Sequence, residues 1–253
     1  MLYSLPSWVV VAGHFALLLI AFYTGFKLKG RSGLNADANM GGNLIISGTL
    51  LSLLLGFTFN NAADKAQKRK LIFSQETNAI SSCFANAKLY PDSCYGDFKK
   101  QLLQYANFRV EYFNNSSNED LIAASLDQSD SVAAIISDQM ATYSRNDKNI
   151  LATQQMVPAV NAMLAARDER ETFRTARVPV AALKMMLLLS LIISFVNGAA
   201  SREPKTYWYG ALAFALLIGM TLFLIFDLDT PAQGLITLDS EQAKLIKLLN
   251  SIK

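Results

Sequence analysis

The chain has 253 residues, of which 52% are hydrophobic and 17% are charged, with a formal net charge of +3 and a mean hydropathy of +0.24. This composition is too apolar for an ordinary soluble domain and too charged for a protein that lies wholly within a membrane. The small net charge gives no reason to expect a nucleic-acid partner, because such proteins concentrate positive charge.

Four apolar segments of membrane-spanning length account for the high hydropathy. They cover residues 7–26, 43–59, 180–200 and 208–226. A helix needs about 20 mostly apolar residues to cross a bilayer, so we expect four transmembrane helices. Between the second and third spans lies the polar stretch 60–179, which is charged and poor in Gly. The expected fold is an all-α membrane protein with a helical region between two pairs of spans.

The polar stretch is predicted to form helices throughout, since no alternating strand pattern is visible. Residues 62–89 lack Pro and Gly, which indicates that the second span continues as one long helix as far as Tyr90-Pro91-Asp92. Three further helices are expected, over residues 95–114, 117–143 and 147–177. Ser117-x-x-Asp120 is a candidate cap for the first turn of the second of these, and Pro158 predicts a kink or break in the third.

Lys and Arg residues near the ends of the spans predict the orientation in the membrane. Eight adjoin the central region, namely Lys65, Lys68, Arg69, Lys70, Arg167, Arg170, Arg174 and Arg177. Five lie at the opposite ends, namely Lys27, Lys29, Arg31, Arg202 and Lys205. This bias places the central region and both termini in the cytoplasm. The predicted parts are transmembrane helices 1 and 2 (1–61), a cytoplasmic helical region (62–178), transmembrane helices 3 and 4 (179–227) and a cytoplasmic C-terminal segment (228–253).

The second span differs from the others because small and large residues occupy separate faces. Small or polar residues recur every four positions at Gly48, Ser52, Gly56 and Asn60. Such a face lets helix backbones approach closely in lipid, so these residues are predicted to pack against another helix. A different face carries Leu50, Leu53, Phe57 and Asn61. If that face lines a central axis, its apolar rings form a constriction that gates by dewetting. The alternative is that the Leu and Phe side chains face lipid.

Isolated polar residues in the apolar segments have ordinary explanations. His14, the only histidine, is expected to form a hydrogen bond with a neighbouring helix rather than to relay protons. Lys184 lies near the cytoplasmic end of the third span, where its amine can snorkel to the interface. Cys83 and Cys94 fall in the predicted cytoplasmic region, a reducing compartment, and are interpreted as structural.

An acidic pair, Asp227 and Asp229, follows the fourth span directly. Paired carboxylates can bind a hard cation such as calcium, or they can cap a helix and pair with Lys or Arg, and both interpretations stay open. No other metal or cofactor is suggested, and the identity of any metal is undetermined. The sequence contains no phosphate-binding Gly-rich loop, no G-x-S-x-G and no H-E-x-x-H, so no enzymatic activity is predicted.

Short motifs at the junctions of the spans carry a family resemblance. They are Leu54-Leu55-Gly56-Phe57-Thr58-Phe59, Glu76-Thr77-Asn78-Ala79-Ile80, Leu89-Tyr90-Pro91, Val157-Pro158-Ala159-Val160-Asn161, Arg177-Val178-Pro179 and Asp227-Leu228-Asp229-x-Pro231-x-x-Gly234. Together they resemble the bacterial bestrophin-like membrane protein family, over residues 50 to about 238. Thr77 departs from the small residue usual in that family.

The resemblance implies a distant relation to bestrophins, which are pentameric ion channels with a large cytoplasmic helical region between the second and third transmembrane helices. Their second helices line the pore and form its apolar neck. An acidic cluster after the fourth helix binds calcium in animal members, and this chain lacks a long acidic run there. Bestrophins differ in whether they pass anions or cations, so the resemblance implies no selectivity.

The expected function is an oligomeric ion channel in the bacterial inner membrane, with an apolar neck near Leu53 and Phe57. Its expected partners are the lipid bilayer, further copies of the chain in a pentamer, and permeant inorganic ions. The alternative is a non-conducting membrane sensor or scaffold that acts through its cytoplasmic helices. A motor subunit of the flagellar-stator type ranks last, because nothing in the sequence implies the partner with a membrane carboxylate that such a motor requires.

Overall fold

The computed structural model describes residues 6–32, 38–115, 118–201, 204–229 and 238–252. Every regular element in these ranges is helical, which confirms the predicted all-α class. The helices are α1 (Ser7–Ser32), α2 (Ala38–Ala87), α3 (Asp92–Asn114), α4 (Glu119–Tyr143), the short 3₁₀ helix η1 (Asp147–Asn149), α5 (Ile150–Thr175), α6 (Val180–Ala200), α7 (Pro204–Asp229) and α8 (Asp239–Ile252).

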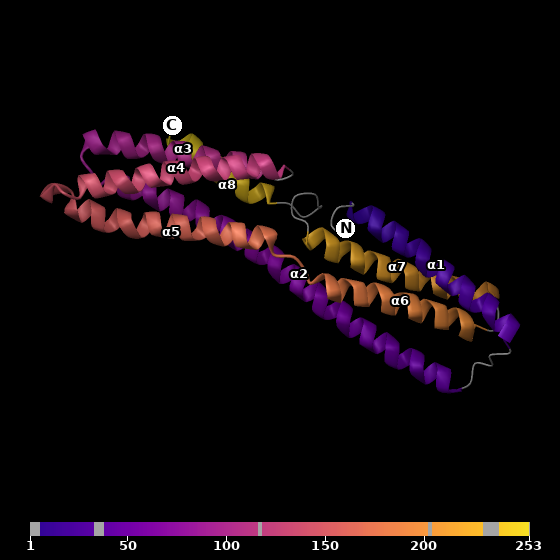
Figure 1. The fold of residues 1–253 in the computed structure, drawn as a ribbon. Coiled ribbons are helices and arrows are strands. Elements are labelled where there is room, and N and C mark those ends of the chain that lie inside the picture. The colour runs from indigo at the N-terminus through magenta and orange to yellow at the C-terminus, as the bar shows by residue number, and fades with distance from the viewer. Residues whose placement is uncertain (1–5, 33–37, 116–117, 202–203, 230–237, 253) are drawn as a thin grey trace. The chain divides into compact units, whose positions relative to one another are not determined.

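The chain divides into two compact units, and α2 contributes to both (Figure 1). Unit 1 comprises Met1–Ala66 and Arg177–Ile236, and therefore contains α1, the first part of α2, α6 and α7. Unit 2 comprises Gln67–Ala176 and Thr237–Lys253, with the rest of α2 and helices α3, α4, α5 and α8.

Four helical stretches are long and apolar enough to cross a membrane, in agreement with the predicted spans. They fall within Ser7–Leu28, Leu44–Ala87, Asp147–Ala200 and Trp208–Asp229. The apolar part of the third corresponds to α6, whose bounds match the predicted third span. Unit 1 thus contains the membrane-spanning segments.

In unit 1, α1 and α6 approach each other closely at two glycines. A Cβ added to Gly25 would lie 2.0 Å from the carbonyl oxygen of Phe195, and one added to Gly198 would lie 2.0 Å from that of Phe22. Only glycine allows the two backbones to approach so closely. The side chains of His14, Ser190 and Ser194 form hydrogen bonds between the same two helices.

Two hydrogen bonds complete the contact between α1 and α6. His14 Nε2 lies 2.9 Å from Ser190 Oγ, and Ser194 Oγ donates to the carbonyl of Leu18 at 2.7 Å. The first confirms that His14 pairs with a neighbouring helix. Ser190, Ser194 and Gly198 recur every four residues, so α6 presents one small, polar face to α1.

In unit 1, α2 buries only one of its faces. Leu51, Thr58 and Ala62 are buried, and Leu51 and Ala62 belong to the apolar cluster that includes α6 and α7 residues. The remaining surface of this part of α2 is largely exposed, including Ile45 and Ile46.

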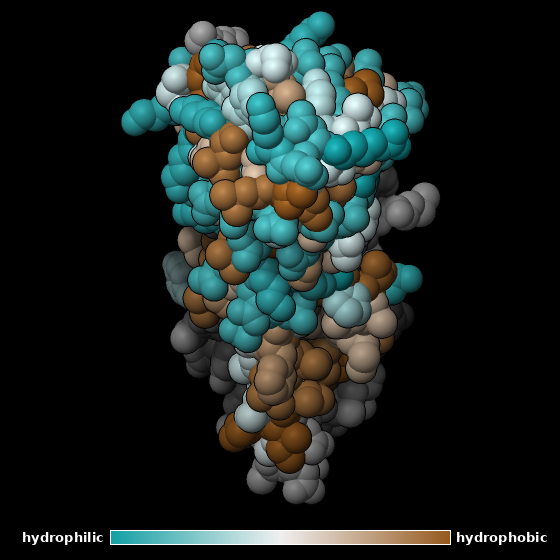
Figure 2. Space-filling model, turned by 90° about the vertical axis from the view of Figure 1, so that its left-hand side faces the viewer, coloured by the Kyte–Doolittle hydropathy of each residue, from teal (hydrophilic) through white to brown (hydrophobic). Residues whose placement is uncertain are grey.

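Unit 2 is built around a continuous apolar core rich in aromatic residues. Phe73, Phe98 and Tyr105 are almost completely buried in it, and α8 adds Leu245 and Leu249. Both cysteines, Cys83 and Cys94, lie in the same core, in agreement with a structural role. Figure 2 shows that hydrophilic residues predominate on the face of unit 2 turned toward the viewer, with hydrophobic residues scattered among them.

The helix boundaries in unit 2 follow the sequence signals in most respects. The second span does continue as one helix, α2, and the chain breaks at Pro91 before α3, as predicted. Asn118 caps α4 by accepting from the backbone N–H groups of Asp120 and Leu121. The predicted cap residue Ser117 lies outside the described residues. Of the two alternatives at Pro158, the break is wrong, because α5 continues through it as one helix, and the kink stays a prediction.

Candidate functional site

The predicted pore-lining residues lie on the exposed surface of α2 in unit 1. The side chains of Leu50, Leu53 and Phe57 are 50%, 55% and 68% exposed, and Asn61 is exposed as well. They lie on a different face from Leu51, Thr58 and Ala62, which pack against the same chain, because successive residues of an α-helix project roughly 100° apart. Half or more of the surface of each of these apolar side chains is therefore left exposed by the rest of the chain.

The predicted packing residues also face away from the other helices of the same chain. A Cβ added to Gly48 or Gly56 would meet nothing within 4 Å, and Ser52 and Asn60 are exposed. The close helix approach within the chain involves Gly25 and Gly198 instead. Packing through the small-residue face of α2 thus stays a prediction that concerns another chain.

The acidic pair after the fourth span is buried. Both carboxylate oxygens of Asp229 lie 3.1 Å from the backbone nitrogen of Val178, which donates to them just before α6 begins. The Arg177 guanidinium donates to the backbone carbonyl of Asp229. This arrangement joins the end of α7 to the start of α6. In the described part of the chain, no group of three or more His, Cys, Asp or Glu side chains is placed to hold a metal ion.

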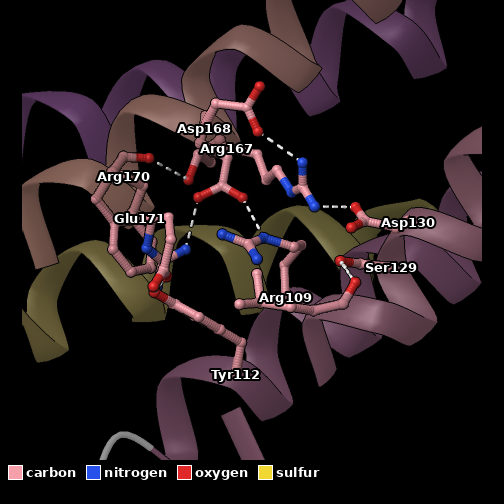
Figure 3. A network of polar contacts seen from close by, with 12 residues as sticks. Arg109, Tyr112, Ser129, Asp130, Arg167, Asp168, Arg170 and Glu171 are labelled. Carbon is pink, nitrogen blue, oxygen red and sulfur yellow. Dashed lines mark hydrogen bonds and ion pairs between the residues drawn. The ribbon is translucent and has the colours of Figure 1, made fainter. Parts of the chain in front are cut away.

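A second polar cluster, which we call the Glu76 triad, lies in the core of unit 2 and consists of Glu76, Arg109 and Arg170 (Figure 3). Glu76 Oε1 accepts from Arg109 Nε, and Glu76 Oε2 accepts from Arg170 Nη1 at 2.6 Å. The three side chains are 1%, 0% and 9% exposed, respectively. Since they come from α2, α3 and α5, the triad ties these three helices together.

The charges of the Glu76 triad stabilise one another despite their burial. Burial alone would raise the pKa of Glu76, but the adjacent guanidinium groups of Arg109 and Arg170 outweigh it and lower that pKa to about 2. Burial tends to lower the pKa of Arg109, whereas the Glu76 carboxylate raises it above the usual value. The triad is therefore ionised at neutral pH.

Aromatic rings enclose the two guanidinium groups. The Arg170 guanidinium lies 4.0 Å from the ring centroid of Phe73 and 4.9 Å from that of Tyr112, while Arg109 lies 4.4 Å from the Tyr112 ring. Such cation–π contacts partly replace the lost hydration of the arginines. The Tyr112 hydroxyl in turn donates to Glu171 at 2.6 Å.

Further ion pairs lie near the triad (Figure 3). Arg167 of α5 pairs with Asp130 of α4 and, within α5, with Asp168 at 2.6 Å. A groove beside these pairs is lined by Leu126, Arg167, Asp168, Glu171, Thr172 and Thr175. These outer side chains are partly exposed, so water screens their interactions more than those of the triad.

In the sequence, Glu76 was recognised only as part of a motif and Arg170 only as one of the basic residues that predict the orientation, and Arg109 had no predicted role. The available signal was a charged residue in an otherwise apolar helical pattern. Arg109 lies between Phe108 and Val110, and nothing in the sequence shows which of the 20 acidic residues it contacts.

Comparisons with known proteins agree with this architecture. A family model described as "Bestrophin-like domain" matches residues 12–243. The sequence matches none of the curated proteins with which it was compared.

Crystal structures of a bacterial bestrophin homolog from Klebsiella pneumoniae share the fold. One of them, of a point mutant, superposes with a TM-score of 0.76 at 10% identity, covering 96% of this chain and 98% of that chain. Another, phased with zinc, gives a TM-score of 0.73 at 9% identity, with 96% of each chain covered. A structure described only as a membrane protein mutant gives a TM-score of 0.73 at 10% identity, covering 98% of this chain and 99% of that one. The chain therefore belongs to the bestrophin-like family of membrane proteins.

Proposed function

We propose that the chain is one subunit of a homo-oligomeric ion channel in the bacterial inner membrane. In this proposal α2 lines an axial pore, Leu53 and Phe57 form its apolar neck, and five copies complete the ring. Both termini and unit 2 lie on the cytoplasmic side. Membership of the bestrophin-like family supports the proposal, since its members are ion channels.

The observation that carries the proposal is the unequal use of the α2 surface in unit 1. One face packs against the same chain through Leu51 and Ala62. A second face offers small residues, with open space around Gly48 and Gly56, and a third exposes Leu53 and Phe57. In a ring, these two faces would contact a neighbouring subunit and the axis, respectively. Rings of apolar side chains at an axis impede ions by excluding water.

Ion flux from liposomes that contain the purified full-length chain tests this function. We expect flux with the wild-type protein, and a several-fold change in flux for Phe57→Ala or Leu53→Ala because the neck widens. Leu217→Ala provides the matched control, since Leu217 on α7 is 67% exposed but lies on a different helix. Equal effects of Phe57→Ala and Leu217→Ala would contradict a neck at Phe57. An absence of flux for all ions, voltages and calcium concentrations would contradict conduction.

The symmetry of the purified particle in electron microscopy tests the assembly. Five-fold symmetry with α2 nearest the axis is the expected result. A monomer or dimer would instead favour the second candidate, a non-conducting sensor or scaffold that acts through unit 2. The exposed apolar side chains of unit 2, including Leu71, Leu89 and Leu151, are compatible with that role because they offer surface for a partner.

A further inference from the structure

Asp64 is the first charged residue of α2 and lies on the same face as the proposed neck. Residues 38–63 of this helix contain no Asp, Glu, Lys or Arg. Asp64 follows Phe57 by seven positions, which at about 3.6 residues per turn returns its side-chain direction to within about 20° of that of Phe57. Both side chains are exposed, and Asp64 lies about 10 Å farther along the helix axis.

The Asp64 carboxylate has no partner among the described residues of its own chain. No Lys or Arg in these ranges forms an ion pair with it, and it takes part in no side-chain hydrogen bond there. Two buried carboxylates, by contrast, are held within the chain, since Glu76 accepts from two guanidinium groups and Asp229 accepts from the Val178 backbone. Asp64 is therefore left to interact with water and its ions.

Two cations that follow Asp64 on α2 are held by the chain itself. Lys65 Nζ donates to the carbonyl of Arg177 at 2.5 Å. Arg69 is 5% exposed and donates to the carbonyls of Phe173 and Ala176 at 3.0 and 2.8 Å. Both side chains therefore point toward the backbone of residues 173–177 and away from the face that carries the neck.

Lys68 lies on the same face of α2 as the neck, but its ammonium group is also held by the chain. It lies 5.8 Å from the ring centroid of Phe173, as in a cation–π contact. At about 1.5 Å per residue, Lys68 is also about 6 Å farther from the neck than Asp64. Lys70 pairs with Glu241 at 3.9 Å. The charge nearest the neck on this face is therefore negative.

A ring of subunits would bring the Asp64 carboxylates together at one mouth of the neck. Like charges that line a narrow opening focus the electrostatic potential and raise the local concentration of counter-ions. Rings of Asp or Glu favour cations in channels for this reason. The neighbouring Asn60 and Asn61 are neutral amides with both donors and acceptors, so they favour neither sign of charge.

We propose that the channel conducts small inorganic cations in preference to anions and that Asp64 sets this preference. The inference rests on the proposed function, since it requires α2 to line an axial pore. The neck and the acidic ring then have separate tasks. The apolar side chains of Leu53 and Phe57 control whether ions pass, and the Asp64 carboxylates control which sign of charge passes.

Reversal potentials measured in planar bilayers across a KCl gradient test the proposal. We expect the purified full-length protein to favour K⁺ over Cl⁻. Asp64→Asn should lower the ratio of K⁺ to Cl⁻ permeability by about tenfold, the lower end of the effect that a like-charged lining has on counter-ion concentration. Asp64→Lys should reverse the preference.

Two further variants serve as controls. Asp138→Asn removes the same charge from an exposed position on α4, and it should leave the permeability ratio unchanged. Lys68→Gln changes a charge on α2 itself, and it should alter the ratio less than Asp64→Asn does, because Phe173 already holds that ammonium group.

The outcomes separate this inference from the channel proposal. Preferential conduction of anions by the wild-type protein would overturn the inference, as would equal permeability ratios in wild type and Asp64→Asn. An equal fall in Asp138→Asn would overturn it too, because the overall charge of the protein would then set the ratio. A larger effect of Lys68→Gln than of Asp64→Asn would assign the selectivity to Lys68 instead. Current with unaltered selectivity contradicts this inference alone, whereas an absence of current in wild type and every variant contradicts the channel as well.

Discussion

The two units differ in the buried polar contacts that join their helices. In unit 1, neutral hydrogen bonds such as that of His14 with Ser190 join α1 to α6 beside a glycine contact, and the buried carboxylate of Asp229 accepts from the Val178 backbone at the start of α6. Unit 2 instead pairs full opposite charges in the Glu76 triad. In lipid, helices gain little from apolar contact with one another, so close packing and neutral hydrogen bonds must hold them together. A core that is stabilised by apolar burial can also include a charged junction in which the carboxylate is paired with guanidinium groups.

The two parts of α2 also differ in how far their large side chains are buried. In unit 1 its large residues Ile45 and Phe57 are exposed, whereas in unit 2 Phe73, Ile80 and Cys83 of the same helix are buried. One continuous helix thus contributes several large side chains to the core of unit 2 and exposes large side chains in unit 1. The exposed surface in unit 1 is available to lipid, to a second chain or to a pore.

Removing the charge of Glu76 should give the largest effect on stability. Glu76→Gln keeps the size of the side chain but leaves Arg109 and Arg170 buried without a counter-charge. Breaking a buried ion pair in this way costs about 3–5 kcal/mol. We expect a large fall in the melting temperature of the full-length protein in detergent, followed by tryptophan fluorescence or circular dichroism.

Glu171→Gln is the matched control, because Glu171 pairs with Arg174 at a partly exposed site. Loss of that ion pair should lower the free energy of unfolding far less than loss of the Glu76 charge. The pH dependence gives a second readout. The pKa of Glu76 falls from 4.5 to about 2 on folding, so its contribution is complete above pH 4.5 and is lost as the pH decreases toward 2. The wild-type melting temperature should therefore fall more steeply on acidification than that of Glu76→Gln. Parallel curves would contradict a stabilising role for this carboxylate.

The glycine contact in unit 1 should give an intermediate effect. In Gly198→Ala, the new Cβ would lie 2.0 Å from the Phe22 carbonyl oxygen and 3.0 Å from the Phe26 nitrogen, so α1 and α6 must separate. Overpacking of this kind costs about 1–3 kcal/mol. The melting temperature in detergent measures the loss.

Gly219→Ala on α7 controls for the change in helix propensity. Its Cβ would meet Val11 Cγ1 at 3.7 Å, which is ordinary van der Waals contact, so we expect little change or a slight gain in stability. If both variants melt at the same temperature, the close approach of α1 and α6 is not a determinant of stability.

The smallest effect is expected for the hydrogen bond between His14 and Ser190. A double-mutant cycle with His14→Ala and Ser190→Ala should give a coupling energy of about 0.6 kcal/mol, the typical value for hydrogen bonds between helices in a membrane. A parallel cycle of His14→Ala with Thr221→Val should give none, because Thr221 donates within its own helix. Equal coupling in both cycles would mean that the His14 bond contributes nothing specific.

Much of the fold could be predicted because its signals are local. The spans follow from hydropathy, and the continuation of α2 follows from the lack of Pro and Gly over 62–89. The continuity of α5 through Pro158 could not be predicted, since neighbouring packing decides whether a helix tolerates a proline. Ser190, Ser194 and Gly198 on α6 have the same spacing of four as the small residues of α2. The contact between α6 and α1 was therefore predictable from the sequence by the same pattern.

The sites were less predictable because they depend on contacts between distant residues. Glu76 and Arg170 are 94 positions apart, and no pattern in one sequence links them. Asp229 was noticed as a candidate cation ligand, yet its contact with the Val178 backbone involves no distinctive side chain at all. Leu53 and Phe57 on the exposed face of α2 were predicted from their spacing to line a pore. Whether they do so depends on whether other subunits or lipid surround the chain, which a single sequence does not specify.

The two buried cysteines make it possible to test by thiol labelling whether water or lipid contacts the exposed face of α2. The chain contains only Cys83 and Cys94, both buried, and burial raises the pKa of the Cys83 thiol to about 12. Thiol reagents act on the thiolate, so the native folded protein should react slowly with them. A single cysteine introduced on α2, for example by Phe57→Cys, would then be the one reactive thiol without removal of the native pair. Its rate of labelling by charged and by lipid-soluble reagents would report whether water or lipid meets that face.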